Sequence, residues 1–172
     1  MIILGIDPGL QTCGYAFLET DQVGQKLIEA GVFQTNVTMP MEKRLNQIAE
    51  DIQALLEKFK PSIVAIEELY SHYEHPKTAI LMGHARGVIL QNCAEAEISV
   101  RSFNATRIKK SVTGNGRASK EQVQRTIQTL FALSTLPEPN DVADAMAVAL
   151  CCANSLDTDF TDYTDLEIKI HA

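Results

Sequence analysis

The sequence predicts an α/β fold built on a mixed five-stranded sheet with helices on both faces. Two segments, 2–6 and 63–66, are continuously apolar, which is typical of strands buried on both sides of a sheet. Two further strand-like segments, 13–19 and 27–35, follow the first one closely, and this predicts an antiparallel meander. Segments with helical periodicity separate the later strands, as expected where helices join parallel strands.

The individual elements follow from periodicity and from the residues that end them. Apolar residues recur at helical spacing over 41–59, and this helix must end before Pro61. The segment 141–153 is apolar nearly all round, which predicts a helix packed into the body of the protein. In chain order, we predict strands at 2–7, 13–19, 27–35, 62–67 and 98–103, and helices at 41–59, 76–96, 105–112, 119–133 and 141–153.

The length of 172 residues suffices for one domain with its own hydrophobic core. We expect this domain to span residues 1–153, followed over 154–172 by an acidic, mobile tail that contains few apolar residues.

The N-terminus has no basic leader and no segment is apolar for long enough to span a bilayer, so we expect a cytoplasmic protein. The four cysteines lack metal-type CxxC spacing and are expected to be reduced core thiols.

The formal net charge of −7 is distributed unevenly along the chain. Residues 101–125 contain seven lysines and arginines against one acid, a local charge of +6, so the remainder carries −13. A basic stretch on an acidic body is a plausible contact surface for a polyanion such as DNA. The alternative is an ordinary solvated helix face, and composition alone does not separate the two.

Four acids occupy positions that suit a two-metal site. Asp7 and Glu67 each end one of the buried apolar strands. In open α/β sheets, functional side chains lie beyond the carboxyl ends of the strands, so these two carboxylates are expected to share a crevice. Asp141 and Asp144 are three residues apart and therefore lie on one face of a helix. Four carboxylates together would repel one another unless divalent cations bind, and hard oxygen ligands favour Mg²⁺ or Mn²⁺ over zinc.

Some of these acids also have a purely structural interpretation. Asp7 precedes a Pro-Gly pair and could simply shape a turn, and Asp141 could complement the dipole of its helix. Glu67 and Asp144 fit such explanations less well, because one ends a buried strand and the other interrupts an apolar helix. Glu68 is excluded from the site, because successive strand residues face opposite sides of the sheet.

A family resemblance rests on five segments that occur in a fixed order. These are Gly-Ile-Asp-Pro-Gly at 5–9, Ala-Ile-Glu at 65–67, Ala-Arg-Gly-Val at 85–88, the stretch 109–120, and Asp-Val-Ala-Asp-Ala at 141–145. Together they resemble the RuvC family of Holliday junction resolvases, which has a ribonuclease H-like fold, over residue 1 to about 153. The resemblance implies two Mg²⁺ ions per active site, replaceable by Mn²⁺, held by the catalytic acids Asp7, Glu67, Asp141 and Asp144.

The resemblance also implies an activity and partners. It implies a structure-selective endonuclease of DNA recombination and repair, which resolves four-way DNA junctions by paired nicks in strands of like polarity. The products would carry 5′-phosphate and 3′-hydroxyl ends. It further implies a homodimer whose contact helix carries Gly83, Ala85 and Gly87, and a branch-migration complex of RuvA and RuvB as a partner.

Several basic and aromatic residues are candidates for catalysis or DNA contact. Lys109 and Lys120 match basic positions of the family and are predicted to be catalytic. A capping box of Ser119 and Gln122 also places Lys120 in a first helical turn, where the dipole disfavours a cation unless a phosphate or carboxylate is near. Tyr70 matches an aromatic that stacks on junction bases, although its loop is one residue longer than usual. The predicted DNA-binding residues are Tyr70, Arg107, Lys109, Lys110, Arg117 and Lys120.

Three other functions are alternatives. A non-catalytic junction-binding module is favoured if the acids serve only structure. An ATPase or kinase of related fold would share Gly-Ile-Asp-Pro-Gly but would need a second phosphate loop and a longer chain, and neither is present. A ribonuclease of the same fold remains open, because nothing in the sequence indicates how a 2′-hydroxyl would be read.

Overall fold

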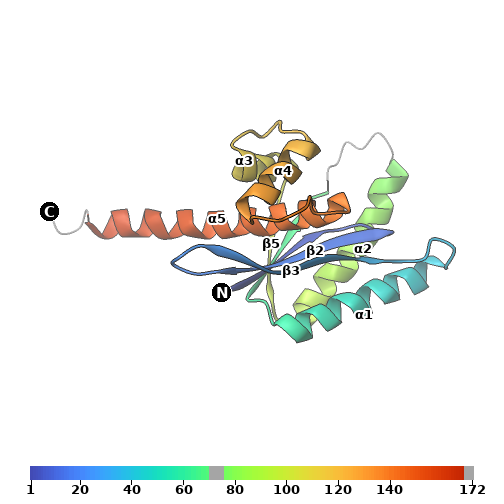
Figure 1. Ribbon diagram of the computed structural model, residues 1–172. Helices are drawn as coiled ribbons and strands as arrows, with labels where there is room; N and C mark the ends of the chain where they lie inside the picture. The colour runs from blue at the N-terminus through green and yellow to red at the C-terminus, as the bar shows by residue number, and fades with distance from the viewer. Residues whose placement is uncertain (70–75, 169–172) are drawn as a thin grey trace.

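The computed structural model describes residues 1–69 and 76–168, and its five strands form one mixed sheet (Figure 1). The strands are β1 (Ile2–Asp7), β2 (Thr12–Thr20), β3 (Gln25–Gln34), β4 (Ile63–Glu67) and β5 (Ser99–Phe103). Their order in the sheet is β3-β2-β1-β4-β5. The first three strands are antiparallel, whereas β4 is parallel to β1 and to β5. The predicted mixed sheet and its meander are confirmed.

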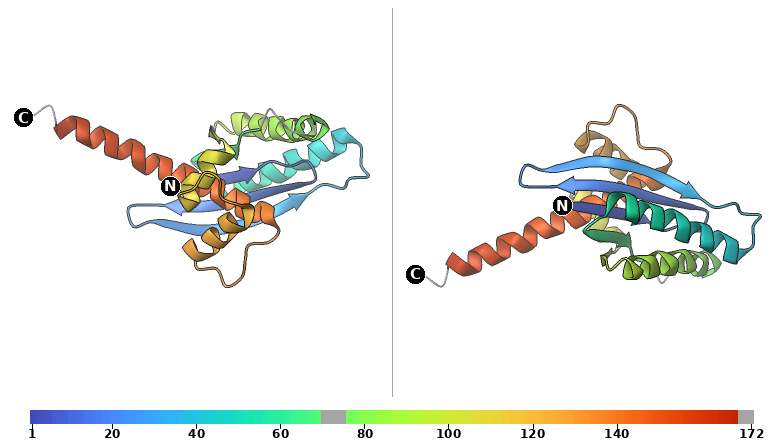
Figure 2. Two further views of the ribbon diagram at one scale, coloured as in Figure 1. Left: turned by 90° about the horizontal axis from the view of Figure 1, so that it is seen from above. Right: turned by 90° about the horizontal axis from the view of Figure 1, so that it is seen from below.

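Helices cover both faces of the sheet, as predicted (Figures 1 and 2). One face carries α1 (Met41–Phe59) and α2 (Pro76–Glu95), and the other carries α3 (Ala105–Thr113), α4 (Lys120–Leu130) and α5 (Asn140–Ile168). Each face has its own core: Leu4 and Ile6 pack with α1 and α2, whereas Ile3 packs with the α5 side. All three side chains are fully buried, so β1 is apolar because both of its faces are covered.

Two glycines allow α5 to lie directly on the sheet. A Cβ atom added to Gly14 would overlap the carbonyl oxygen of Asp141, and one added to Gly5 would overlap that of Ala145. Any larger residue at these positions would push α5 away from β1 and β2. The close approach therefore fixes where the first turn of α5 lies above the sheet.

Side-chain caps fix where the two basic helices begin. The Asn104 side chain accepts a hydrogen bond from the backbone N–H of Arg107 and starts α3. Ser119 and Gln122 form the predicted capping box at the start of α4. Lys120 is consequently the first residue of α4, as the sequence predicted.

The last helix is longer than predicted. We expected it to end near residue 153, but α5 continues to Ile168 and extends beyond the sheet (Figure 1). No glycine or proline occurs between 154 and 168, so nothing in the sequence ends the helix there. Polar composition predicted solvent exposure, which is compatible with a helix. Among the described residues, no helix has the length and apolar character needed to cross a membrane.

The small residues of α2 are not equivalent. Ala85 is fully buried in the core beneath α2, so the expectation that it contacts a second copy of the chain is wrong. Gly87 is exposed and a Cβ atom added there would meet nothing, while Gly83 lies near the side chain of Leu69. Of these three small residues, only the two glycines remain candidates for a contact surface.

Candidate active site

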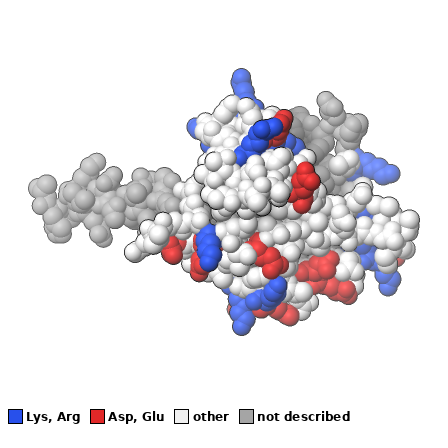
Figure 3. Space-filling model, in the orientation of Figure 1, with Lys and Arg blue, Asp and Glu red and all other residues white. Residues whose placement is uncertain are grey.

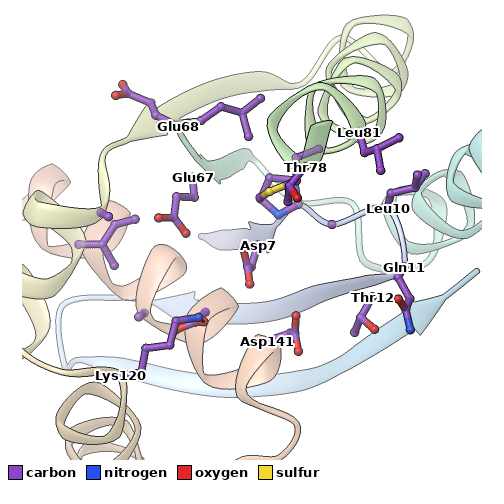
Figure 4. Close-up of a pocket in the computed structure, with 18 of the residues that line it drawn as sticks. Asp7, Leu10, Gln11, Thr12, Glu67, Glu68, Thr78, Leu81, Lys120 and Asp141 are labelled. Atoms are coloured by element: carbon purple, nitrogen blue, oxygen red, sulfur yellow. The ribbon is translucent and has the colours of Figure 1, made fainter. Parts of the chain in front are cut away.

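Asp7 and Glu67 lie side by side at one edge of the sheet. Ile6 of β1 pairs with Ile66 of the parallel strand β4, so the next residue of each strand reaches the same edge. Both carboxylates border a crevice of about 740 Å³, and Figure 4 shows them pointing into it. The position predicted from the two apolar strands is therefore observed.

The first turn of α5 contributes the other two acids. In the antiparallel register Asp7 pairs with Gly14, whose Cα lies against the backbone of Asp141. Asp141 is thus brought next to Asp7 across the sheet surface (Figure 4). Asp144 follows nearly one turn later and lines the same crevice. The structure brings together all four predicted acids, which come from two strands and one helix.

Burial and mutual repulsion disfavour the charged forms of the strand acids. The pKa of Asp7 is raised from 3.8 to about 7, chiefly by burial and next by the negative charge of Asp144. Glu67 and Asp141 add to this increase, and the Lys120 ammonium opposes it. Burial, followed by Asp144, also raises the pKa of Glu67, while Lys120 and Lys109 lower it. The crevice therefore has a surplus of negative charge that a cation would relieve.

Two lysines face these acids from the helical side of the crevice. Lys120 Nζ donates a hydrogen bond to Asp144 Oδ2 over 3.1 Å, and Asp144 is the main cause of the raised Lys120 pKa. The Lys120 side chain is 72% exposed, so this ion pair adds little to stability. Lys109 is half-buried on α3 and lines the same crevice. Both predicted catalytic lysines are thus placed where an anionic ligand would enter.

The donor set fits a hard divalent cation, although the side chains are not gathered around one point. Among the described residues, no group of three or more His, Cys, Asp or Glu side chains stands at metal-binding spacing. The carboxylates nevertheless line one crevice, and the charge of Asp144 contributes to the raised pKa values of both Asp7 and Glu67. Carboxylate oxygens are the ligands that Mg²⁺ and Mn²⁺ prefer, so these residues fit such ions after side-chain rotation.

Three other predicted DNA-binding residues lie outside the crevice. Arg107, Lys110 and Arg117 are exposed on α3 and the connection to α4, and none of them lines it. The guanidinium of Arg107 lies 5.0 Å from the centre of the Phe103 ring. Tyr70 lies outside the described residues. Glu68, which we excluded from the site, also lines the crevice at its rim, but its side chain is exposed and points away from Asp7 (Figure 4).

Sequence reasoning missed the opposite end of the crevice. Arg44 of α1 lines it there together with Leu10, Gln11, Thr12 and Val37. In the sequence of an amphipathic helix, a single arginine looks the same as a solvent-exposed surface residue. Only its contacts in the structure show that it lines the crevice. The hydrogen bond between Arg44 and the carbonyl of Leu10 has no signal in the sequence.

The sheet order and the acids at its edge define a protein of the ribonuclease H-like class. Comparison with known proteins identifies the family within this class. A sequence model of the family described as "Crossover junction endodeoxyribonuclease RuvC" matches residues 3–152, and the chain belongs to the RuvC family.

Relatives and solved structures agree with this assignment. The chain is 46% identical to the RuvC of Rhodopirellula baltica, covering 87% of this chain and 84% of that one. It is 42% identical to the RuvC of Heliobacterium modesticaldum, covering 91% and 96%. Thermus thermophilus RuvC in complex with Holliday junction substrate matches with a TM-score of 0.82 and 30% identity over 88% of this chain and 92% of that one. The yeast mitochondrial resolvase Ydc2 shares the fold, with a TM-score of 0.64 at 14% identity, covering 88% and 77%.

Proposed function

We propose that this protein is a Holliday junction resolvase that nicks paired strands of like polarity by metal-dependent phosphodiester hydrolysis. The observation that carries the proposal is the convergence of Asp7, Glu67, Asp141 and Asp144 on one crevice bordered by two lysines. Similarity to a RuvC solved with junction substrate supports the choice of DNA structure. The ATPase alternative has no comparable support, and a non-catalytic junction-binding module would leave four mutually repelling acids without a role.

The four acids would hold two Mg²⁺ ions, with Mn²⁺ able to substitute. The RuvC family is a family of metal-dependent nucleases, which supports this choice. Bound metal would supply Lewis-acid stabilisation and an activated water. Asp7 stands at the centre of the set and neighbours acids from both β4 and α5. Its carboxylate would therefore be one of the residues that hold the cations.

Lys120 and Lys109 would act on the DNA. The Lys120 ammonium is paired with Asp144 but largely exposed, so it would also be able to donate to a phosphate oxygen at the crevice. Lys109 would contact the same strand from α3. The two ammonium groups would orient the scissile phosphate and offset charge that develops on it. Attack of water on phosphorus with cleavage of the P–O3′ bond would give the 5′-phosphate and 3′-hydroxyl ends that the family resemblance implies.

The basic residues outside the crevice would hold the junction arms. Arg107, Lys110 and Arg117 are exposed, and Figure 3 shows basic side chains projecting from the α3–α4 region, with most acids of that face nearer α1. A negative net charge is thus compatible with a basic contact surface on α3 and α4. Tyr70 is proposed, on resemblance alone, to stack on junction bases.

A homodimer would place two such crevices on one junction. The exposed face of α2 presents Ile80, His84 and Gly87 at helical spacing, and Ile80 is 60% exposed. This stripe is the proposed contact between two copies of the chain. RuvA and RuvB are proposed partners by family resemblance, and a cytoplasmic location is proposed with them.

Single-turnover cleavage of a synthetic four-way junction across a Mg²⁺ titration tests the function. Asp144→Asn keeps the size of the side chain but removes one charge. The cleavage rate should fall on the order of 100-fold or more, as expected for loss of an essential catalytic group, while junction binding survives. Glu50→Gln, an exposed acid on α1 outside the crevice, is the matched control and should cut normally. Duplex, fork and RNA/DNA hybrid substrates separate a resolvase from a general nuclease or ribonuclease. Parental cleavage by Asp144→Asn at every Mg²⁺ concentration would leave the non-catalytic binding module as the better reading.

A further inference from the structure

Arg44 lies at the end of the crevice that is remote from the two lysines. It belongs to the first turn of α1, on the opposite face of the sheet from α3 and α4. Its hydrogen-bond partner Leu10 and the crevice lysine Lys120 lie on opposite sides of Asp7 in Figure 4. The crevice therefore runs from a lysine end, past the acids, to an arginine end.

The Arg44 guanidinium is held in place by buried partners. Its Nε donates a hydrogen bond to Thr35 Oγ1 over 3.0 Å, and its Nη2 donates to the carbonyl oxygen of Leu10 over 3.3 Å. Thr35 is only 7% exposed, and its hydroxyl donates to the same Leu10 carbonyl over 2.6 Å. One edge of the guanidinium is thus fixed between the β1–β2 turn and the end of β3. Such a group loses little conformational freedom when a ligand binds.

The rest of the guanidinium is left for a ligand. An arginine carries more N–H donors than the two used here, and those on Nη1 make no hydrogen bond within the described parts of the chain. No carboxylate among the described residues forms an ion pair with Arg44. A half-buried cation without an acidic partner is costly, unless an anion completes its surroundings.

We propose that Arg44 binds a backbone phosphate of the cleaved strand, on the side of the scissile phosphate away from Lys109 and Lys120. This inference rests on the proposed function. A strand lying along the crevice would pass the lysines, then the acids, then Arg44, and phosphates recur along it at every nucleotide. Guanidinium groups bind phosphate oxygens through paired N–H donors. Arg44 would thus fix the direction of the strand by a contact on its far side.

Salt dependence of junction binding distinguishes this role from a structural clamp. Binding is measured for Arg44→Gln in Ca²⁺, where the junction stays uncut, over a series of salt concentrations. Loss of one phosphate contact should reduce the slope of log K against log salt by ~0.9 and weaken binding about tenfold. Arg44→Lys keeps the charge and should retain most of the slope. Lys43→Gln removes the same charge from an exposed neighbour that does not line the crevice, and should leave the slope unchanged.

The outcomes separate this inference from the proposed function. If the unaltered protein neither binds nor cuts a junction, the proposed function fails. If it binds and cuts, but Arg44→Gln keeps the full salt slope, Arg44 is a clamp and the inference is overturned. Equal slope losses for Arg44→Gln and Lys43→Gln would also overturn it, because general surface charge would then explain both. Thermal melting of each variant verifies that the slope is measured on folded protein.

Discussion

At the scale of single residues, the buried negative charge of the site lowers the stability of the fold. Asp7 has a folded-state pKa of about 7 against an ordinary 3.8, so the folded state holds its proton more tightly than the unfolded state. Stability from this group is complete below pH 3.8 and is lost as the pH rises to about 7. Above pH 7, where Asp7 is ionised, its buried charge therefore destabilises the fold until a cation binds.

The first prediction is that Asp7→Asn stabilises the metal-free protein, because it removes a charge that is buried and repelled. In a chelating buffer at pH 8, the variant should have a higher melting temperature than the parent, and its free energy of unfolding should be larger by up to roughly 4 kcal/mol. This gain should vanish near pH 4. Added Mg²⁺ should raise the melting temperature of the parent and much less that of the variant. A gain that is equal at both pH values would contradict the assignment to ionisation of Asp7.

A second prediction concerns Gly14, which positions Asp141. Gly14→Ala forces β2 and the start of α5 apart, and this overpacking should cost about 1–3 kcal/mol. Because Asp141 moves with that turn, the Mg²⁺ concentration for half-maximal cleavage should rise. Gly31→Ala is the control, since the atoms nearest to its added methyl belong to the Tyr15 ring and hydroxyl. It should change stability without changing the Mg²⁺ requirement, and an unchanged requirement in Gly14→Ala would refute the positioning role.

At the scale of elements, the sequence predicted those features that depend on residues close to one another in the chain. The apolar strands placed Asp7 and Glu67, and the capping box placed Lys120, because each signal lies within a few residues of the site. The side of α2 that is buried was not predictable, since apolar residues occur all round that helix, and Ala85 was consequently misassigned. Arg44 was missed because its position depends on Leu10, 34 residues away in the sequence.

The end of the folded domain follows from contacts of α5 with the body. The Asn154 side chain bonds to Gln25 and to Ser111, Ser155 accepts from Arg101, and Leu156 packs against the core. A domain boundary at 153 would cut all of these contacts. We therefore place the proposed boundary after Leu156, with the acidic segment beyond it.

The third prediction is that truncation after Leu156 leaves the melting temperature nearly unchanged, whereas truncation after Ala153 lowers it. Removing the acidic segment should also tighten junction binding at low salt, because like charge near the DNA is lost. Differential scanning calorimetry and binding at two salt concentrations test both parts. A large loss of stability on truncation after Leu156 would mean that the segment beyond it docks on the body.

At the scale of the whole molecule, one crevice can cut only one strand at a time. Resolution of a junction needs two nicks, and therefore two crevices acting on the same DNA. The crevice lies at the carboxyl ends of β1 and β4, and the N-terminal half of α2 runs beside it, since Thr78, Leu81 and Met82 line it. A pairing through α2 would place two crevices near the axis of a dimer.

The fourth prediction tests this pairing. Ile80→Glu puts a charge into the exposed α2 stripe, so the protein should become monomeric in sedimentation, because two buried carboxylates would face each other across the axis. On a cruciform plasmid, the monomer should produce nicked circles, whereas the parent produces linear DNA by paired nicking. Val23→Glu replaces another exposed apolar residue in the β2–β3 turn and should leave the dimer intact. An Ile80→Glu variant that remains dimeric and still linearises the plasmid would place the dimer contact on another face.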